Sequence, residues 1–299
     1  MEKKSLVTIG VCVKNEESNI EEALRSIIDQ DFPKEDMEII VVDGYSKDKT
    51  VPIIKENLSK ACIDFKILYD NNGLGRARQI VVENANTEYI IWLDADLIFS
   101  RDYVRKQVEF MNEKTAAGIS KGRYGICSWK SLASFLENMS YVVESLKYVD
   151  KEAPRLVGTE GAIYRVKAIK QVGGFDGNIR GAAEDLEAAY RIRSHGWLFF
   201  INNSIFFEKC RDTWKDLWKE YVWWGIGGHY SFHKDKRIIP LYEMLPLSGL
   251  YAGLSRSFTA YRLIHRKSSF LMPLHYFFKR IAWWYGFIKA HFQKYGHSN

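Results

Sequence analysis

The sequence predicts an α/β fold built on a mostly parallel β-sheet flanked by helices. Over the first hundred residues, short apolar segments rich in β-branched residues alternate with segments of helical pattern. This alternation is typical of right-handed βαβ units. Polar residues directly follow four of the apolar segments, as expected where parallel strands end at a ligand-binding edge. With 299 residues, 46% of them hydrophobic and 27% charged, the chain can form one large domain with an appendage.

The first hundred residues contain four predicted strands and three helices. The strands are expected at residues 6–13, 38–42, 65–69 and 89–93, and the helices at 18–30, 48–59 and 76–86. Ser18 and Glu21 have the spacing of a capping box, which favours a helix start there. Residues 89–93 are uniformly apolar, as in a strand buried on both faces of a sheet.

The alternation is less regular after residue 100. Helices are expected at residues 129–148 and 184–194, and extended segments at 156–164 and 199–207. The composition changes near residue 210, and no internal repeat or low-complexity linker is present. We therefore expect a first domain over residues 1–210 and a helical region over residues 211–299.

The C-terminal region is basic and aromatic. Residues 211–299 carry 14 Lys and Arg against 5 Asp and Glu, and six of the nine tryptophans. This charge favours an anionic partner, either a membrane surface or a nucleic acid. Long apolar runs separate the basic residues, which suits lipid better than a groove that follows phosphates, so no nucleic-acid partner is expected.

Two segments of this region bear on membrane binding. Residues 238–254 are too short and too interrupted by proline for a spanning helix. Residues 269–292 mix aromatic side chains with three basic ones, as in an amphipathic helix lying at a membrane interface. We expect peripheral contact with a membrane through residues 211–299. The alternative is a soluble protein whose C-terminal helices cover the sheet or form a dimer.

Cysteine and histidine usage predicts no zinc ribbon and no disulfide framework. The four cysteines are far apart and form no CxxC pair, so a reduced, cytosol-facing protein is expected. The N-terminus passes from charged residues directly into a strand, so no signal peptide is expected. The seven histidines are expected in ordinary surface or packing roles, with none paired as metal ligands.

Four polar segments are expected to meet at the carboxyl edge of the sheet. They are VKNEE at 13–17, VVDGYS at 41–46, NNGLGRAR at 71–78 and DAD at 94–96. Asp43 can accept hydrogen bonds from a base or a ribose. Gly73 and Gly75 permit close backbone approach, and Arg76 and Arg78 can pair with phosphate.

Asp94 and Asp96 directly follow the fourth strand. If the chain stays extended there, alternate side chains point the same way and the two carboxylates converge. Such carboxylates are tolerated in a buried setting when they hold a cation or a ligand. A hard divalent ion that also binds phosphate suits them best.

Six segments together resemble family-2 glycosyltransferases of the GT-A fold, in the family's order and spacing over residues 5–225. They are VTIGVCVKNEESNIEEALRSI, VVDGYSKDKT, GLGRARQ, IIWLDADL, GTEGAIYRVKAIKQVGGFD and AAEDLEAAYRIRSHGW. The resemblance implies a Rossmann-like GT-A domain and an inverting transfer from a nucleoside-diphosphate sugar. It also implies a Mn²⁺ or Mg²⁺ ion that neutralises the leaving diphosphate.

The resemblance assigns roles to individual residues. Those expected to contact the nucleotide sugar are Val13, Asn15, Glu16, Asp43, Gly73, Gly75, Arg76, Arg78, Asp94 and Glu160. Those expected to hold the metal are Asp96, Asp94 and Glu208, the last standing where many relatives carry a histidine. The QxxRW motif of processive synthases is missing, so long-chain polymerisation is not expected.

The pair Glu184 and Asp185 is the expected catalytic element. Acidic residues at a helix start are also favoured by the helix dipole alone. In the family the pair supplies the base that deprotonates the acceptor hydroxyl, and Asp185 matches that base. If the acceptor is an ionised lipid phosphate, no base is needed and Asp185 would orient the acceptor instead.

The sequence favours a transferase that works at the cytoplasmic face of the membrane on a lipid-linked or glycan acceptor. A nucleotidyltransferase would carry a glycine-rich basic loop after its first strand, where this chain has the acidic VKNEESN. A soluble transferase with a non-lipid acceptor, and a nucleotide-sugar-binding protein without activity, remain as alternatives. The joint presence of Asp94, Asp96 and Asp185 counts against an inactive protein.

Overall fold

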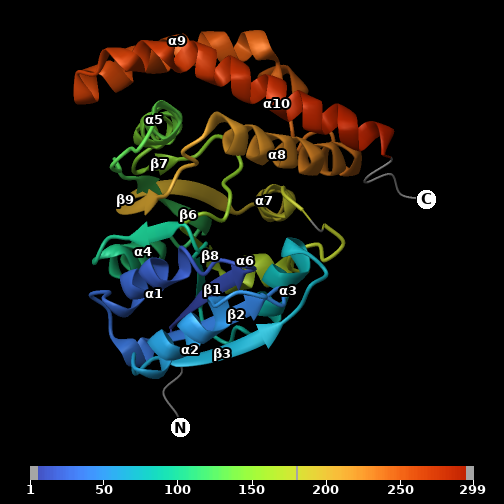
Figure 1. Ribbon diagram of the computed structural model, residues 1–299. Helices are drawn as coiled ribbons and strands as arrows, with labels where there is room; N and C mark the ends of the chain where they lie inside the picture. Colours follow the sequence, from blue (N-terminus) through green and yellow to red (C-terminus); the bar gives the residue numbers. More distant parts are fainter. Residues whose placement is uncertain (1–5, 180, 294–299) are drawn as a thin grey trace. The chain divides into compact units, whose positions relative to one another are not determined.

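The computed structural model describes residues 6–179 and 181–293 (Figure 1). The chain divides into two compact units. Unit 1 is formed by Met1–Arg123, Tyr148–Arg180 and Asp185–Phe207. Unit 2 is formed by Tyr124–Lys147, Gly181–Glu184 and Glu208–Asn299. The chain thus passes between the units several times, and the segment just before Asp185 belongs to unit 2.

Unit 1 is built on a sheet of nine strands in the described part of the chain. The strands are β1 Val7–Val13, β2 Met37–Asp43, β3 Asp64–Tyr69, β4 Tyr89–Trp92, β5 Leu97–Phe99, β6 Ala117–Tyr124, β7 Lys151–Glu152, β8 Ala162–Arg165 and β9 Leu198–Glu208. Their order is β3-β2-β1-β4-β8-β6-β9-β5, with β7 paired to β9. Strands β1 to β4 pair in parallel, whereas β8 pairs antiparallel with β4 and β6. The predicted α/β fold is confirmed.

The register of the parallel strands brings their carboxyl ends to one edge. Val13 lies opposite Asp43, and Asp43 lies opposite Tyr69. The last residue of β4, Trp92, pairs with Gly10 in the middle of β1. Strand β4 therefore ends three residues short of the end of β1, and the acidic segment follows it directly.

Helices cover the sheet of unit 1. They are α1 Ile20–Ile28, α2 Thr50–Ser59, α3 Leu74–Asn84, α4 Tyr103–Glu113, α6 Val166–Gln171 and α7 Glu184–Ser194, together with the 3₁₀ turn Lys34–Asp36. The predicted capping box of Ser18 and Glu21 is wrong. Helix α1 is capped at Asn19 without a side-chain hydrogen bond, and Glu21 instead pairs with Arg25 at 2.5 Å.

Two further predictions concern residues 148–208. The segment 156–161, predicted as extended, is a loop, and only β8 is a strand there. Gly161 has φ 61°, and the N–H of Ala162 donates to the Thr159 carbonyl at 2.8 Å, so a turn replaces the expected strand. The predicted strand at 199–207 is confirmed as β9.

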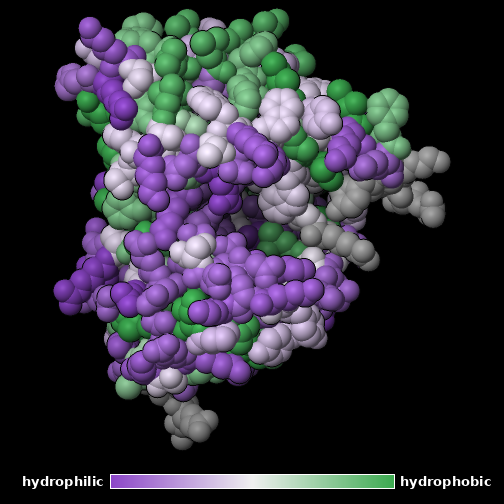
Figure 2. All heavy atoms as spheres, viewed as in Figure 1, coloured by the Kyte–Doolittle hydropathy of each residue, from purple (hydrophilic) through white to green (hydrophobic). Residues whose placement is uncertain are grey.

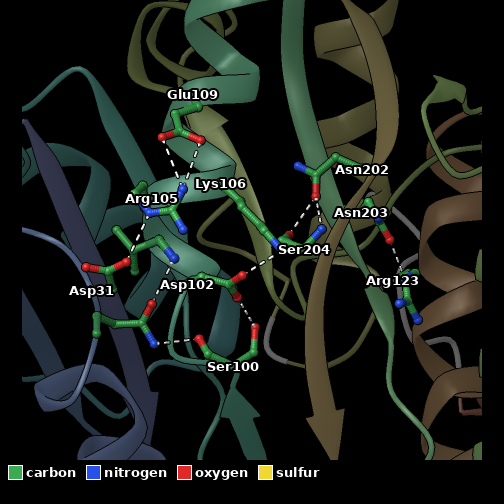
Figure 3. Close-up of polar contacts among 12 residues, drawn as sticks. Asp31, Ser100, Asp102, Arg105, Lys106, Glu109, Arg123, Asn202, Asn203 and Ser204 are labelled. Carbon is green, nitrogen blue, oxygen red and sulfur yellow. Dashed lines mark hydrogen bonds and ion pairs between the residues drawn. The ribbon is translucent and has the colours of Figure 1, made fainter.

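Polar contacts tie the outer elements of unit 1 together (Figure 3). Arg105 on α4 donates to Asp31 at 3.2 Å and to Glu109 at 3.3 Å. Arg123 on β6 donates to Asn203 on β9 at 2.7 Å. These bonds fix α4 to the loop after α1, and β6 to β9.

Unit 2 is helical. Its helices are α5 Leu132–Leu146, α8 Trp214–Lys234, α9 Pro246–Ile264 and α10 Met272–Phe292, with 3₁₀ turns at Leu241–Met244 and Lys267–Leu271. Helices α8 and α10 approach closely, because a Cβ at Gly225 or Gly286 would collide with a backbone carbonyl of the other helix. Within the described ranges, no helix combines the length and the apolarity needed to cross a bilayer.

A buried ionic network joins three helices of unit 2. The carboxylate of Glu137 on α5 accepts from Lys279 at 2.8 Å, from His275 at 2.6 Å and from the Tyr221 hydroxyl at 2.7 Å. Burial alone would raise the pKa of Glu137, but the charge of Lys279 and the bond from His275 hold it well below its ordinary value. The carboxylate is therefore ionised inside the helical unit and links α5 to α8 and α10.

We predict that Glu137→Gln lowers the free energy of unfolding by about 3–5 kcal/mol at pH 8, because it leaves the buried Lys279 charge without its counter-ion. The carboxyl pKa of Glu137 is depressed in the folded state, so the stability it contributes is present above its ordinary value of 4.5 and is lost as the pH falls below it. The gap between wild type and variant in urea unfolding should therefore close in acid.

Glu113→Gln, an exposed change at the end of α4, is the matched control and should leave stability unchanged. Replacing both partners, as Glu137→Leu with Lys279→Met, should recover much of the loss. Equal stability of Glu137→Gln and wild type at pH 8 would contradict the role given to this network.

Candidate functional site

The loops after β1 and β2 form a cross-linked polar rim. The buried Asp43 carboxylate accepts from the Ser46 N–H at 2.9 Å and from its hydroxyl at 2.5 Å. The Ser46 oxygen in turn accepts from the N–H of Asn15 at 2.8 Å, and Asn15 Oδ1 accepts from the N–H of Lys47 at 2.9 Å. Asn15 and Tyr45 both have φ 56°, a left-handed conformation that these bonds hold in place.

Val13 and Glu16 also have structural partners at this rim. The Val13 side chain is buried, and its carbonyl accepts from the N–H of Gly44 at 2.8 Å. The N–H of Glu16 donates to Thr50 at 2.7 Å, and its carboxylate accepts from Asn19 at 3.1 Å. The structure thus brings both residues to the expected edge. Their contact with a ligand stays a prediction.

An aromatic pair that was not predicted from the sequence lies at the same edge. Tyr45 and Tyr69 are 57% and 45% exposed, and their ring centroids are 5.6 Å apart. Tyr69 is the partner of Asp43 in the β2–β3 register, and Tyr45 stands two residues after Asp43. Exposed aromatic faces of this kind suit stacking of a nucleobase. The pair could have been predicted, because each of two neighbouring strands has an aromatic residue at its end or just beyond it.

The glycines before and within α3 serve the packing of the chain itself. Gly73 has φ 114° and caps the helix. A Cβ at Gly75 would collide with the carbonyl of Asp176 and would lie 2.7 Å from that of Ile179, which accepts from the Gly75 N–H at 3.1 Å. The close approach predicted at Gly75 is therefore made by the protein's own backbone.

The two arginines of α3 have different partners. Arg76 pairs with Glu83 of the same helix at 2.8 Å, beside a hollow that Asn72, Gly177 and Asn178 also line. Arg78 is buried and pairs with Asp94 Oδ1 at 3.3 Å. Of the two, Arg78 is the one that the structure brings to the aspartates after β4.

The segment after β4 is a turn. The N–H of Leu97 donates to the Asp94 carbonyl at 3.0 Å, so the expected extension through Asp96 is wrong. The turn still keeps the two carboxylates near each other. Burial raises the pKa of Asp94 to about 6, and the charges of Asp96 and Glu160 add to this shift while Arg78 opposes it.

A second pair of carboxylates converges at the loop before β8. A Cβ at Gly158 would lie 2.8 Å from Asp185 Oδ2 and would collide with the Glu160 carboxylate. Asp185 accepts from the N–H of Leu186 at 2.7 Å and of Thr159 at 3.3 Å. Lys121 on β6 pairs with Glu160 at 2.8 Å. The lack of a side chain at 158 is what lets the two carboxylates meet.

The pKa values of these two carboxyls move in opposite directions. Burial and the charge of Glu160 raise the pKa of Asp185, although Arg78 opposes the shift. Burial also acts to raise the pKa of Glu160, but the charge and hydrogen bond of Lys121 outweigh it and lower that pKa. Asp185 is thus the member of the pair that takes up a proton more readily.

Asp94, Asp96, Glu160 and Asp185 form a carboxylate cluster in unit 1, and Arg78 and Lys121 are its basic neighbours. The four acids outnumber these two bases. Carboxylate oxygens are the ligands that Mn²⁺ and Mg²⁺ prefer, so the donor type suits a divalent ion. Among the described residues, no three of these carboxylates bring their ligand atoms within 4.8 Å of one another. The role of Lys121 was not predicted from the sequence. The feature that could have indicated it is a lysine within an otherwise β-prone segment.

Two predicted site residues lie in unit 2. Glu184 is buried and is one of them. The next residue, Asp185, is half-buried, belongs to unit 1 and is the member of the pair that joins the carboxylate cluster. Glu208 is the last residue of β9 and belongs to unit 2, whereas Asp94 and Asp96 belong to unit 1. Its role as a third metal ligand stays a prediction.

Residues 8–173 match the profile of the family described as Glycosyl transferase family 2. The chain is 25% identical over 256 residues to the poly-beta-1,6-N-acetyl-D-glucosamine synthase of Staphylococcus aureus strain COL. This match covers 80% of the chain and 60% of that synthase, so the chain spans less than two thirds of its relative's length.

Two solved structures share the fold. The mannosyltransferase PcManGT from Pyrobaculum calidifontis, in complex with GDP-Man and Mn²⁺, aligns with a TM-score of 0.70 at 18% identity, over 98% of this chain and 88% of its own. Residues 1–349 of S. aureus TarS, in complex with UDP-GlcNAc, align with a TM-score of 0.52 at 15% identity, over 98% and 93%.

We predict that Gly75→Ala lowers the free energy of unfolding by about 1–3 kcal/mol, because the new methyl group meets backbone that cannot move aside cheaply. Gly177→Ala is the control, since its Cβ would make only ordinary contact with Arg76 at 3.4 Å. Thermal unfolding of the two variants measures the difference. A Gly75→Ala protein as stable as Gly177→Ala would show that the α3 loop is not packed as described.

Proposed function

This chain belongs to glycosyl transferase family 2, and we propose that it moves a sugar from a nucleoside-diphosphate sugar to an acceptor in a metal-dependent, inverting reaction. The observation that carries the proposal is the carboxylate cluster at the carboxyl edge of the sheet, with Arg78 beside it. Two solved structures of this fold contain a nucleotide sugar, and one of them also contains Mn²⁺.

The rim at β1 and β2 is proposed to bind the nucleoside. The Asp43 carboxylate is fixed by two bonds from Ser46, so it offers a pre-oriented acceptor to a ribose or base. Tyr45 and Tyr69 supply exposed rings on which a base can stack. GDP-linked and UDP-linked donors both suit this arrangement, and each occurs in one of the similar structures.

The turn after β4 is proposed to hold the diphosphate end of the donor. Asp94 and Asp96 would bind the divalent ion, which when bound neutralises the charge that builds up on the leaving diphosphate. Arg78 is held against Asp94 at 3.3 Å and adds a fixed positive charge on the same side. Glu208 remains the proposed further ligand.

Asp185 is proposed as the base. Its pKa is raised by burial and by Glu160, which favours taking a proton from an acceptor hydroxyl as its oxygen attacks the anomeric carbon. Two backbone N–H groups orient the carboxylate. In-line attack opposite the leaving group inverts the sugar carbon. With an ionised phosphate acceptor, the same carboxylate would position the acceptor without accepting a proton.

The enzyme is proposed to add one sugar to each acceptor, without building a long chain. The relative reported above is named as a polymer synthase, but the stretch that begins at Arg211 in this chain lacks the QxxRW motif. A lipid-linked or glycan acceptor is proposed. Separation of reaction products by size distinguishes one added sugar from a ladder of chain lengths.

We predict that a thermal-shift screen of nucleotide sugars finds a stabilising donor whose effect requires Mn²⁺ or Mg²⁺. Asp96→Ala should abolish turnover and most of the metal-dependent shift. Asp185→Ala should keep the shift while transfer falls by roughly 10²–10⁴-fold, the usual scale for a positioned base.

Asp64→Ala is the control, because Asp64 is an exposed aspartate at the opposite end of β3 from the site. Normal transfer by Asp185→Ala would remove its proposed role. Full activity after treatment with a chelator would remove the metal from the mechanism. A donor-dependent shift without any transfer to lipid or glycan acceptors would favour the binding protein over the enzyme.

Peripheral membrane contact is proposed through α9 and α10. Helix α9 buries small or polar residues, Gly249, Gly253, Ser257 and Ala260. It exposes a stripe of large apolar residues at helical spacing, Leu247, Tyr251, Leu254 and Phe258, which are 53–79% exposed. The helix therefore points its apolar face away from the rest of unit 2. Figure 2 shows hydrophobic residues gathered over these helices.

Helix α10 also exposes apolar side chains, while it buries both aromatic residues such as Trp283 and Phe287 and two polar ones. It buries the polar His275 and Lys279 against Glu137, and it exposes Leu274, Tyr285 and Phe292 by 55–81%. Exposed Arg262 and Lys267 lie at the C-terminal end of α9 and in the turn that leads to α10. Apolar side chains flanked by cations suit the interface of an anionic leaflet, which we propose is the cytoplasmic one.

We predict that the protein pellets with liposomes containing phosphatidylglycerol. Changing Leu247, Tyr251, Leu254 and Phe258 together to serine should weaken partitioning roughly 100-fold or more, because each buried apolar side chain contributes about 1 kcal/mol or more. Ile126→Ser with Leu132→Ser, exposed apolar residues outside α9 and α10, is the control. Equal pelleting of the two variants, or none by wild type, would favour the soluble alternative.

A further inference from the structure

Three histidines of unit 2 lie together on α8 and α10. His229 and His233 are four residues apart on α8, and His291 is the penultimate residue of α10. Residues four apart on a helix share one face. The expectation that no histidines have metal-ligand spacing is therefore wrong, and the i, i+4 spacing in HYSFH was the signal that could have found them.

The ligand atoms of these three imidazoles lie within 4.8 Å of one another. His229 Nε2 and His291 Nδ1 are 3.3 Å apart. Two nitrogens bound to one tetrahedral zinc ion at about 2.0–2.1 Å would be separated by about 3.3–3.4 Å. The first pair thus already has the spacing of two zinc ligands, and a rotamer change of the exposed His233 side chain would complete a set of three.

We propose that His229, His233 and His291 bind a transition-metal cation, with Zn²⁺ as the favoured ion and water at the fourth position. Neutral imidazole is a good ligand for Zn²⁺, Ni²⁺ and Cu²⁺, whereas Mg²⁺ and Mn²⁺ favour oxygen. The site differs in donor type from the carboxylate cluster of unit 1. It therefore takes a different class of metal from the one proposed for sugar transfer.

The surroundings of the three rings suit this role. His229 is fully buried, and its ring centroid lies 5.0 Å from that of Phe287 on α10. Phe287 also contacts Phe232 at 5.8 Å, so aromatic side chains hold one ligand in place. His233 and His291 are exposed, which gives the ion a path from solvent and leaves room for a water ligand.

The bound ion would act as a clamp between α8 and α10. Helix α8 also packs on residues 182–183, because a Cβ at Gly227 would collide with the Ala182 carbonyl and Ser231 lies 3.4 Å from the Ala183 carbonyl. Residues 182 and 183 lead directly into Glu184 and Asp185. Fixing α8 therefore fixes the unit 2 segment from which the proposed base emerges.

The test uses the full chain without a histidine tag. Wild-type protein should bind one equivalent of Zn²⁺, raise its melting temperature in Zn²⁺, and give the visible spectrum of tetrahedral Co²⁺ when Co²⁺ replaces it. His233→Gln with His291→Gln should weaken binding at least tenfold and abolish that spectrum. These exposed changes leave the buried His229 in place, so the fold should survive.

His195→Gln, an exposed histidine in unit 1, is the matched control and should bind as wild type does. Binding should also persist in Asp96→Ala, which separates this site from the proposed transferase metal and keeps the two proposals independent. Absence of the Co²⁺ spectrum in wild type, or equal Zn²⁺ affinity in the double histidine variant, would overturn the inference.

Discussion

The excess of negative charge at the carboxyl edge of the sheet is the constraint on which the rest of unit 1 depends. Asp94, Asp96, Glu160 and Asp185 share a partly buried space with Arg78 and Lys121. Moving a carboxylate out of water costs free energy, and for this reason burial raises the pKa of Asp94 to about 6. A divalent cation and the diphosphate it carries would relieve it. The cluster of carboxylates therefore lowers the stability of the ligand-free protein and favours binding of the proposed cation.

Small residues make this concentration of charge geometrically feasible. Gly158 leaves room for Glu160 and Asp185 to converge, and Gly75 lets α3 approach the loop at 176–179 so that Arg78 reaches Asp94. Ala183, with φ 75°, holds an uncommon conformation just before the expected catalytic pair. The positive φ of Ala183 and the close packing at Gly75 and Gly158 thus lie beside the residues for which chemistry is proposed.

The sequence predicted local features well and long-range partners poorly. The parallel strands, the glycine turn before α3 and the acids after β4 are encoded by neighbouring residues, so their pattern was sufficient.

The prediction of a capping box failed because Glu21 pairs with Arg25, four residues further along the helix. The extension at Asp94 failed because a hydrogen bond from Leu97 closes a turn. Lys121 lies 39 residues from Glu160, so no local sequence pattern predicts that ion pair. The spacing of His229 and His233 was visible, but their approach to His291 depends on how α8 packs on α10.

Unit 2 combines a buried ionic network with an exposed apolar surface. Its interior holds Glu137, Lys279 and His275 in one ionic network, while the outer faces of α9 and α10 carry leucine and aromatic side chains. In water such a unit has both an internal desolvation cost and an exposed apolar surface. Covering the outer faces with lipid, as proposed above, would remove the second cost. A partner protein could cover the same faces, but the cations at the end of α9 and in the turn that leads to α10 favour an anionic lipid surface.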